Sequence, residues 1–379
     1  MDFALTEAQR MFQATAREVA DQIIAPRAEE TDVTGAFPHE TVKRLGELGF
    51  MGVAVPETYG GAGADTVCYA IAMEEVSRAC ASTGVIMSVN NSLVCDPLLA
   101  FGTESQKQQY LVPLARGENL GCFCLSEPNA GSDAANQETT ARRDGAAYLL
   151  TGTKNFISNG AEADVALAFA SLDRSKGHHG IAAFLVERSF PGFTVAKLEK
   201  KLGIKGSSTA QIVLDNCRVP AENRLGKEDE GFKIAMATLD GGRIGIAAQA
   251  VGIARAAFEA ARDHAKARVQ FGKPIATLQA IQFMLADMAT EIEAARLLTY
   301  RAALLKDAGR RFTSEAAMAK LYASEAAMRI TTKAIQVHGG YGYMLDYPVQ
   351  RFFRDAKITE IYEGTSEIQR LVIAGHLLK

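Results

Sequence analysis

Apolar residues recur every three or four positions near the start of the chain, as they do on one face of a helix. The clearest set is Phe12, Ala16, Val19 and Ile23. In front of this set, Thr6 and Gln9 have the spacing of a capping box, in which each side chain accepts a hydrogen bond from the other residue's backbone amide. The pattern predicts a helix that begins just after Thr6.

Further signals of helix ends follow up to about residue 115. Pro38 is placed to open a second helix and Gly49 to end it, because proline suits the first turn of a helix and glycine the position after the last. Thr103 and Gln106 repeat the capping-box spacing and predict a third helix. We expect residues 1–120 to form an N-terminal α-helical domain.

The pattern changes after residue 120. Four short apolar runs, typical of strands, alternate with clusters of turn-forming residues. The runs cover residues 148–150, 165–170, 181–186 and 211–214. Asn159-Gly160 and residues 178–180 (HHG) are among the turns. We expect a middle β domain over residues 121–230.

Long helical patterns return in the last part of the chain. Three alanine-rich stretches without proline cover residues 243–268, 278–307 and 313–337. Helices of this length pack side by side in antiparallel bundles. Pro274 and Pro348 both fall between the predicted helices. The chain is therefore expected to be an α+β multidomain protein that ends in a four-helix bundle over residues 231–379.

Composition and charge exclude several classes of protein. Hydrophobic residues make up 48% of the 379 positions and charged residues 22%, as in ordinary globular proteins and unlike disordered chains. The net charge is −3, so no strong positive field draws the protein to nucleic acid. No apolar run approaches the length that crosses a bilayer. We expect neither a nucleic-acid partner nor a membrane span.

The six cysteines are scattered, and only Cys122 and Cys124 lie close together. Their spacing fits neither a CxxC redox pair nor a zinc site, so reduced and mostly buried thiols are expected. The first residues (MDFA) show neither a basic leader nor an arginine-rich transit pattern. A cytoplasmic protein is expected, or a mitochondrial-matrix protein from which a transit peptide has been removed.

Several common catalytic motifs are missing from the sequence. It contains no GxxxxGK[ST] phosphate loop, no GxGxxG after a strand, no HExxH and no GxSxG. Nucleotide binding of the Rossmann or P-loop kind, metal catalysis and serine hydrolysis have no motif to support them. We predict no metal site.

Two polar, glycine-containing segments remain. Residues 125–133 (LSEPNAGSD) stand where the β segment begins, and their small side chains would let backbone amides approach a ligand. Residues 361–367 (IYEGTSE) precede the final helix, for which Thr365 or Ser366 is placed as N-cap. Glu363 stands just before it, as a carboxylate that can serve as a general base. On spacing alone, a connecting loop and a surface acid are the simpler interpretations.

Five motifs, in order along the chain, resemble those of the acyl-CoA dehydrogenase family. They are residues 125–133, residues 154–159 (KNFISN), Arg268-x-x-Phe271-Gly272, Gln336-x-x-Gly339-Gly340 and residues 361–369 (IYEGTSEIQ). The resemblance covers essentially the whole chain and matches its α–β–α plan. Residues 84–93 (GVIMSVNNSL), 202–210 (LGIKGSSTA) and 232–245 (FKIAMATLDGGRIG) look most like the short-chain (butyryl-CoA) dehydrogenases.

The resemblance implies an FAD-dependent enzyme that converts butyryl-CoA to crotonyl-CoA. In the family a base removes the α-proton of the thioester, and the β-hydrogen leaves as hydride to flavin N5. The match assigns the base to Glu363 and places Gly364 beside the thioester. The backbone amide of Glu363 and a ribityl hydroxyl of FAD would polarise the thioester carbonyl. Burial would raise the pKa of the carboxyl toward the working pH.

One departure within the family supports this assignment. Isovaleryl-type and long-chain relatives carry the base on a bundle helix, just before the arginine that matches Arg243. That position is Gly242 here, which has no side chain and cannot act as a base. Asp240 and Arg243 fall in the family's substrate-binding stretch, and Ser132 would touch the CoA portion.

The same motifs imply which residues hold FAD. The flavin ring would be lined by Phe123, Leu125, Ser126 and Ser132, and on its opposite side by Phe156, Ile157 and Ser158. Many relatives have tryptophan where this chain has Phe156, so stacking would survive with a smaller ring. Thr365 and Glu367 would complete the site.

A second group would reach the FAD of a neighbouring subunit. Its members are Arg268, Phe271, Gln279, Gln336, Val337, His338, Gly339 and Gly340. Arg268 would offset the charge of the pyrophosphate, and the two glycines would allow close backbone approach. Such contacts require at least a dimer, and the resemblance implies a homotetramer built as a dimer of dimers. It also implies electron-transferring flavoprotein as the electron acceptor.

Alternatives remain within and outside this family. A branched-chain substrate of the 2-methyl or isovaleryl type is possible, because pocket depth depends on a few side chains. A glutaryl-CoA enzyme is disfavoured because it places an arginine near Gly84, and an acyl-CoA oxidase is normally much longer. A non-catalytic acyl-CoA or flavin-binding homologue is the alternative from another class. Retention of Glu363 argues against it, since a pure binder needs no base.

Overall fold

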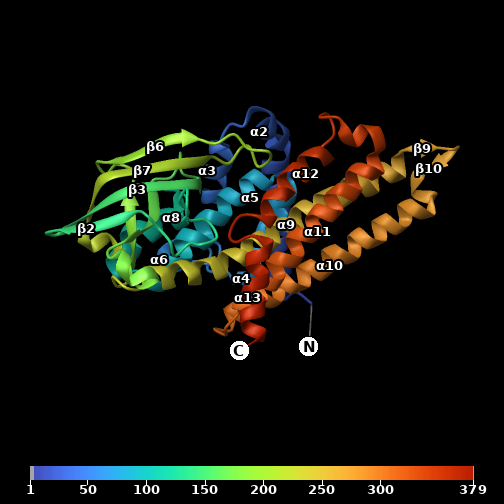
Figure 1. Ribbon diagram of the computed structural model, residues 1–379. Coiled ribbons are helices and arrows are strands. Elements are labelled where there is room, and N and C mark those ends of the chain that lie inside the picture. Colours follow the sequence, from blue (N-terminus) through green and yellow to red (C-terminus); the bar gives the residue numbers. More distant parts are fainter. Residues whose placement is uncertain (1–3, 379) are drawn as a thin grey trace.

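In the computed structural model, a sheet lies at one end of the molecule and long helices extend from the other (Figure 1). The structure describes residues 4–378. Lys379 lies outside the described residues, as do Met1, Asp2 and Phe3, which entered the prediction about a leader. The order of the elements is helical, then β, then helical. The predicted α–β–α plan is confirmed.

The first part of the chain consists of short helices. They are α1 (Glu7–Val19), α2 (Ala28–Thr34), α3 (His39–Glu47), α4 (Thr66–Ala79), α5 (Ala81–Ser88), α6 (Asp96–Phe101), α7 (Glu104–Gln106) and α8 (Val112–Ala115). Both capping boxes are confirmed: Thr6 and Thr103 accept from the amides of Gln9 and Gln106, each at 3.2 Å. A π-helical segment (Val89–Cys95) joins α5 to α6 in one continuous helix.

The middle of the chain forms one mixed sheet. Its strands are β1 (Gly121–Cys124), β2 (Thr140–Asp144), β3 (Ala147–Ser158), β4 (Val165–Ser171), β5 (Ile181–Glu187), β6 (Phe193–Leu198), β7 (Thr209–Pro220) and β8 (Arg224–Leu225). The order is β6-β7-β3-β2-β4-β5-β8, and β1 pairs with β4 in parallel. The four predicted apolar runs lie within β3, β4, β5 and β7. The HHG cluster is the end of a 3₁₀ segment (Arg174–Gly180).

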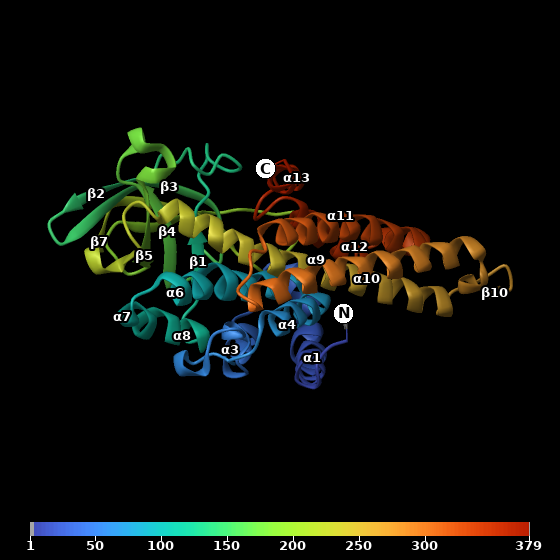
Figure 2. The same cartoon turned by 90° about the horizontal axis from the view of Figure 1, so that it is seen from below.

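The last part contains the long helices. They are α9 (Gly231–Ala267), α10 (Gln279–Asp307), α11 (Thr313–His338), α12 (Val349–Ala356) and α13 (Ser366–Leu377), and a small hairpin of β9 (Val269–Gln270) and β10 (Lys273–Pro274) lies between α9 and α10. α9 begins at Gly231 rather than at residue 243. Its first turns pack on β5, and Figure 2 shows it running from the sheet to the tip of the bundle. At 1.5 Å per residue its 37 residues span about 55 Å.

Two helical stretches are long and apolar enough, by length and composition, to cross a bilayer: Ala81–Phe101 and Gly231–Ala267. No apolar stretch of this length was predicted from the sequence. In the fold, 78% and 83% of their most apolar windows are buried against other elements. Such burial is the property of core helices of a globular domain.

The first and last parts of the chain share one hydrophobic core, which runs from Ala16 in α1 to Ala356 in α12. Another core lies in the sheet region. All six cysteines are free and buried, as predicted, and Cys122, Cys124 and Cys217 pack in this core. The remaining thiols are buried in the helical parts.

Buried ion pairs join α4 to α9 and α10 of the last part of the chain. Glu74 and Glu75 are 3% and 0% exposed. The guanidinium of Arg255 on α9 lies 3.1 Å from Glu74 and 2.8 Å from Glu75, and Arg296 on α10 lies 2.8 Å from Glu74. Burial opposes the charge of Glu75, but the arginines outweigh burial and hold its pKa below the usual range. Glu75 therefore depends on its arginines to remain charged inside the protein.

Replacing Arg255 by methionine should leave two buried carboxylates short of a partner. We expect Arg255→Met to cost about 3–5 kcal/mol of stability. Arg262→Met, on the same helix but in a pair with the exposed Asp263, should cost less than about 1 kcal/mol. Thermal unfolding of the two variants checks this, and equal shifts in Tm would contradict it.

Candidate active site

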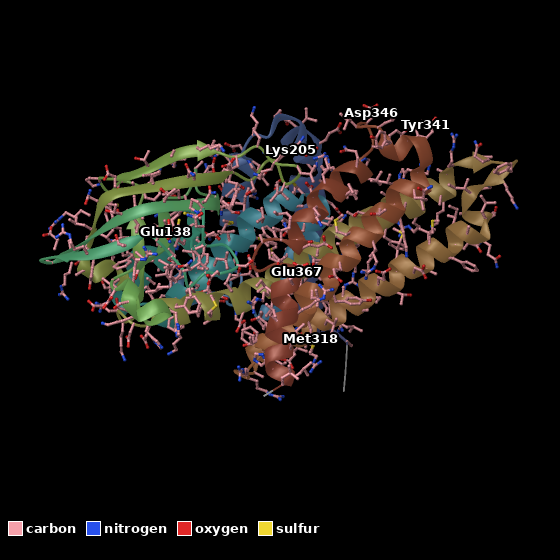
Figure 3. The ribbon with its side chains drawn as sticks, in the orientation of Figure 1. Glu138, Lys205, Met318, Tyr341, Asp346 and Glu367 are labelled. Atoms are coloured by element: carbon pink, nitrogen blue, oxygen red, sulfur yellow. The ribbon has the colours of Figure 1, made fainter. Side chains whose placement is uncertain are left out.

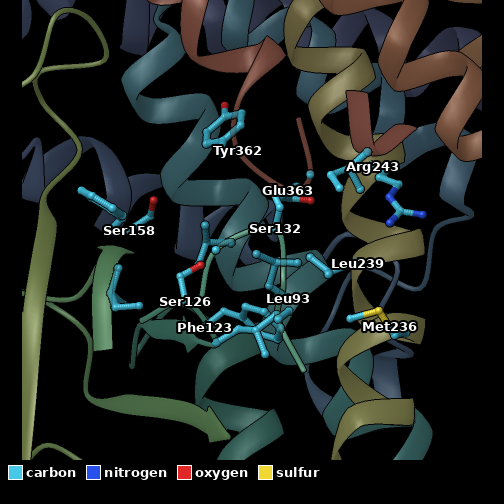
Figure 4. Close-up of a pocket in the computed structure, with 18 of the residues that line it drawn as sticks. Leu93, Phe123, Ser126, Ser132, Ser158, Met236, Leu239, Arg243, Tyr362 and Glu363 are labelled. Atoms are coloured by element: carbon cyan, nitrogen blue, oxygen red, sulfur yellow. The ribbon is translucent and has the colours of Figure 1, made fainter. Parts of the chain in front are cut away.

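A cavity of about 290 Å³ opens where the sheet, α9 and the segment before α13 meet (Figure 4). One wall is apolar. Val85, Val89 and Leu93 stand four residues apart on the continuous helix of α5 and α6, and Phe232, Met236 and Leu239 face them from α9. Spacings of three and four positions place each set on one face of its helix. An apolar chain fits this wall without unpaired polar groups.

The rest of the cavity lining mixes polar and apolar side chains and contains nearly half of the predicted site residues. Ten predicted residues line it: Phe123, Leu125, Ser126, Ser132, Phe156, Ile157, Ser158, Arg243, Glu363 and Gly364. They come from β1, the loop after it, the end of β3, α9 and the turn before α13. The fold thus brings together residues that are up to 241 positions apart in sequence, between Phe123 and Gly364. Their individual roles stay predictions.

Buried amides hold the apolar wall against the sheet. Asn90 accepts from the amide of Gly121 at 2.9 Å and donates to the carbonyls of Met51 and Leu114. Asn159, at the end of β3, donates to the carbonyls of Ile86 and Gly121, each at 3.2 Å. The bonds between Asn90 and Gly121 and between Asn159 and Ile86 join the continuous helix of α5 and α6 to the sheet.

A buried ion pair supports the loop after β1. Lys154 has no exposed surface, and its ammonium donates to Glu127 at 2.7 Å, to Gln137 at 3.0 Å and to the carbonyl of Leu125 at 3.3 Å. Glu127 also accepts from the backbone amides of residues 138 and 139. Burial lowers the pKa of Lys154, and the Glu127 carboxylate opposes that change. These bonds attach the loop that carries Ser126 and Ser132 to β3 and to the residues before β2.

Glu363 occupies a turn with unusual backbone angles. Its φ is 53° and that of Gly364 is 95°, both in the left-handed region. For a glutamate this conformation is rare, and it persists only where the surroundings hold it. The side-chain amide of Gln369 donates to the carbonyls of Glu363 at 3.1 Å and Gly364 at 2.9 Å, and the ammonium of Lys320 donates to the latter at 2.6 Å.

The carboxylate of Glu363 points into a poorly solvated space. Its Oε2 is buried and has no hydrogen-bond partner among residues 4–378. Burial raises the pKa of Glu363 to about 7, against the opposing charges of Lys320 and Arg243. A Cβ placed on Gly242 would overlap this oxygen, so the missing side chain on α9 makes room for the carboxylate. An unpaired carboxylate with a pKa near neutrality is suited to accept a proton.

Arg243 lies next to Glu363 in the cavity wall (Figure 4). It is 5% exposed, and its guanidinium pairs with Asp240 at 2.7 Å. Asp240 also accepts from the hydroxyl of Thr313 at 2.6 Å and does not itself line the cavity. Burial lowers the pKa of Arg243 and raises that of Asp240.

A second hollow contains another part of the predicted site. It is lined by Arg268, Val337, His338, Gly339 and Gly340, together with His264 and Tyr341. Arg268, at the end of α9, stands 25 positions after Arg243, which is about 37 Å along the helix. Figure 3 labels Tyr341 in this region and Glu367 near the first cavity, and the two lie well apart.

The guanidinium of Arg268 lies 5.2 Å from the centre of the Tyr341 ring, and no carboxylate of the described chain is within ion-pair distance of it. A Cβ on Gly339 or Gly340 would meet nothing within 4 Å. The second hollow therefore offers an uncompensated positive charge beside open backbone. That combination suits an anion such as a phosphate.

The remaining predicted residues lie outside both hollows. Phe271 is 89% exposed between β9 and β10, and Gln279 and Gln336 are exposed on α10 and α11. Thr365 is confirmed as the N-cap of α13, accepting from the amide of Ile368, and Glu367 is exposed in the first turn. Within one chain, the structure does not bring these residues into contact with the first cavity.

Several cavity residues were not predicted individually. They are Val85, Val89, Leu93, Phe232, Met236, Leu239, Tyr362 and Ile368. The spacing of four between the first three was a usable signal of one helix face. Lys320 was also not predicted, because no motif surrounds it in the sequence.

Comparison with known proteins finds matches to one family along the whole chain. Three domain profiles match: "Acyl-CoA dehydrogenase, N-terminal domain" at residues 6–118, "middle domain" at 122–217 and "C-terminal domain" at 229–378. The mouse protein "Short-chain specific acyl-CoA dehydrogenase, mitochondrial" is 56% identical over 375 residues, 99% of this chain and 91% of its own length.

Two solved structures match over the full length of both chains. One is butyryl-CoA dehydrogenase from Megasphaera elsdenii, with 50% identity and a TM-score of 0.98. The other belongs to work on the electron transferring flavoprotein of Acidaminococcus fermentans and flavin-based electron bifurcation, with 52% identity and a TM-score of 0.99. The chain is therefore a member of the acyl-CoA dehydrogenase family of flavoprotein oxidoreductases.

Proposed function

We propose that this protein catalyses the FAD-dependent α,β-dehydrogenation of short-chain acyl-CoA, with butyryl-CoA to crotonyl-CoA as its reaction. The observation that carries the proposal is the Glu363 carboxylate, which is unpaired and poorly solvated in a cavity with an apolar wall. The names of the mouse relative and the Megasphaera structure support the short acyl chain.

The proposed reaction divides one oxidation between two groups. The carboxylate of Glu363 takes the α-proton, and the electrons of that C–H bond form the new Cα=Cβ bond. The β-hydrogen leaves with two electrons as hydride, which FAD accepts when bound. As the α-proton leaves, negative charge develops on the thioester oxygen, and the backbone N–H of Glu363 would stabilise it.

The residues present fit FAD. Phe156 lines the cavity with 64% of its surface exposed and a φ of 60°, an arrangement that leaves one face of the ring free to stack. The hydroxyls of Ser126, Ser132 and Ser158 line the same space, and a Cβ on Gly131 would meet nothing within 4 Å. We propose these residues, with Phe123, Leu125 and Ile157, as the flavin site.

The distance between the two hollows supports a shared cofactor site. A group bound at Glu363 does not reach Arg268 of the same chain, about 37 Å away along α9. We propose that Arg268, Phe271, Gln279, residues 336–340, Thr365 and Glu367 complete FAD sites in a homotetramer of two dimers. Phe271, which is almost fully exposed, would be covered in this assembly.

We further propose electron-transferring flavoprotein as the electron acceptor, in keeping with the subject of the Acidaminococcus structure. The proposed domains are residues 1–120, 121–230 and 231–379. The proposed location is the cytoplasm, or the mitochondrial matrix for a processed chain. The name of the mouse relative describes that protein as mitochondrial.

Anaerobic titration with acyl-CoA thioesters tests the proposed function directly. The purified protein should be yellow, and butyryl-CoA should bleach its flavin absorbance more readily than hexanoyl-, octanoyl- or isovaleryl-CoA. Preferential bleaching by isovaleryl-CoA would move the substrate to the branched-chain class. A colourless protein that neither takes up FAD nor turns over would overturn the proposal in favour of a non-catalytic homologue.

Substitution of the proposed base should separate binding from chemistry. Glu363→Gln keeps the size of the side chain but removes the proton acceptor. We expect it to retain FAD and to bind butyryl-CoA, while flavin reduction slows by about 10²- to 10⁴-fold. Stopped-flow absorbance measures this rate, and normal reduction by the variant would refute the assignment.

The space next to Gly242 provides a sharper test of geometry. Gly242→Ala introduces a methyl group that must displace Glu363 Oε2, and a misplacement of about 1 Å costs about 100-fold in rate. Gly241→Ala is the matched control, because its Cβ would stand 3.3 Å from Asp96 and 3.5 Å from Lys306, away from the base. Equal flavin-reduction rates in the two variants would contradict the role of Gly242.

A further inference from the structure

Lys320 is a fully buried lysine behind the Glu363 turn. It lies on α11, and its side chain has no exposed surface. Its ammonium donates to the carbonyl of Gly364 at 2.6 Å, which links α11 to the left-handed turn. Burial lowers the pKa of Lys320 to about 8. Burying a lysine ammonium costs free energy of folding, so a functional role would explain why it lies behind this turn.

Two positive charges lie near Glu363, and only one of them is already in an ion pair. The groups that face it are Lys320 from α11, Arg243 from α9, the Tyr69 phenol from α4 and the adjacent Tyr362. Arg243 is already paired with Asp240 at 2.7 Å. Lys320 has no carboxylate within ion-pair distance anywhere in residues 4–378. Lys320 also faces the carboxylates of Glu360 and Glu367 at longer range, but Glu363 is the acid that interacts with it most strongly.

The hydrogen bonds to the turn can be separated from this charge. Gln369 donates to the same Gly364 carbonyl at 2.9 Å and to that of Glu363 at 3.1 Å, but it is neutral. Lys320 supplies both a hydrogen bond and a charge. The chain thus contains two supports of one turn, and only one of them is ionic.

We infer that Lys320 is a positioning residue for the proposed reaction, which holds the Glu363–Gly364 turn through the Gly364 carbonyl and supplies a positive charge that favours the ionised form of Glu363. The inference rests on the proposed function for its consequence in catalysis. Its electrostatic part concerns Glu363 alone and is independent of the substrate.

The sign of the effect follows from the chemistry of the base. Only the ionised carboxylate accepts a proton, so activity falls as pH decreases through the pKa of Glu363, which is about 7. A nearby positive charge favours the ionised form. Removing it raises the pKa of Glu363, and the acid limb of the pH–rate profile moves to higher pH.

The test compares Lys320→Met with Gln369→Leu. We expect both variants to reduce flavin more slowly, because each loosens the turn. In Lys320→Met the acid limb should move upward by about one pH unit or more, so that activity lost at pH 7 returns in part at higher pH. In Gln369→Leu the limb should stay in place. An unmoved limb in FAD-loaded Lys320→Met would overturn the inference.

A second readout does not require turnover. Infrared difference spectra can follow the protonated carboxyl band of Glu363 against pH, with the band assigned by its loss in Glu363→Gln. This titration should move upward in Lys320→Met and in Lys320→Gln, which keeps a donor without the charge. Lys320→Gln also serves if the methionine variant does not fold. If native protein is not reduced by any acyl-CoA, the proposed function fails, whereas an unshifted infrared titration defeats this inference alone.

Discussion

One long helix, α9, passes so close to other parts of the fold that no side chain fits between them. A Cβ on Gly231 would overlap the backbone of β5, one on Gly245 the Tyr69 hydroxyl, and one on Gly252 the backbone of α4. Gly242 leaves the corresponding space for the Glu363 carboxylate. Because interiors pack without spare volume, an added methyl at Gly231 or Gly252, where the neighbour is backbone, would push two elements apart. The sheet, the N-terminal helices and the turn with Glu363 are all located relative to this helix.

Charged groups buried around this framework occur where the backbone must be held. The Glu74 and Glu75 pairs lie between α4 and the bundle, and the Lys154–Glu127 pair lies under the loop after β1. Such pairs add little net stability, but losing one partner leaves an uncompensated charge and costs several kcal/mol. Each pair therefore disfavours alternative packings more strongly than it stabilises the native one.

Sequence reasoning succeeded where the pattern is local. Capping boxes at Thr6 and Thr103, the buried strand β4 and the N-cap Thr365 each follow from a few neighbouring residues. It predicted a helical domain around α4 and α5 but not their bounds, because nearly every residue there is buried and the alternation of polar and apolar positions is lost.

The candidate site divides in the same way. The motifs around Glu363 and Ser132 could be found from the resemblance, and the fold then placed them at one cavity. Long-range geometry accounts for what was missed, since nothing near Lys320 in sequence indicates that its ammonium meets Gly364.

The buried carboxylate of Glu363 also affects folding. Its pKa is about 7 in the folded chain against an ordinary value of 4.5, so the folded state binds this proton more tightly than the unfolded state. Stability therefore falls as pH rises from 4.5 to 7, and above pH 7 the ionised group costs about 3 kcal/mol. A neutral residue at position 363 would make a more stable and inactive protein, so selection for stability alone would remove the base.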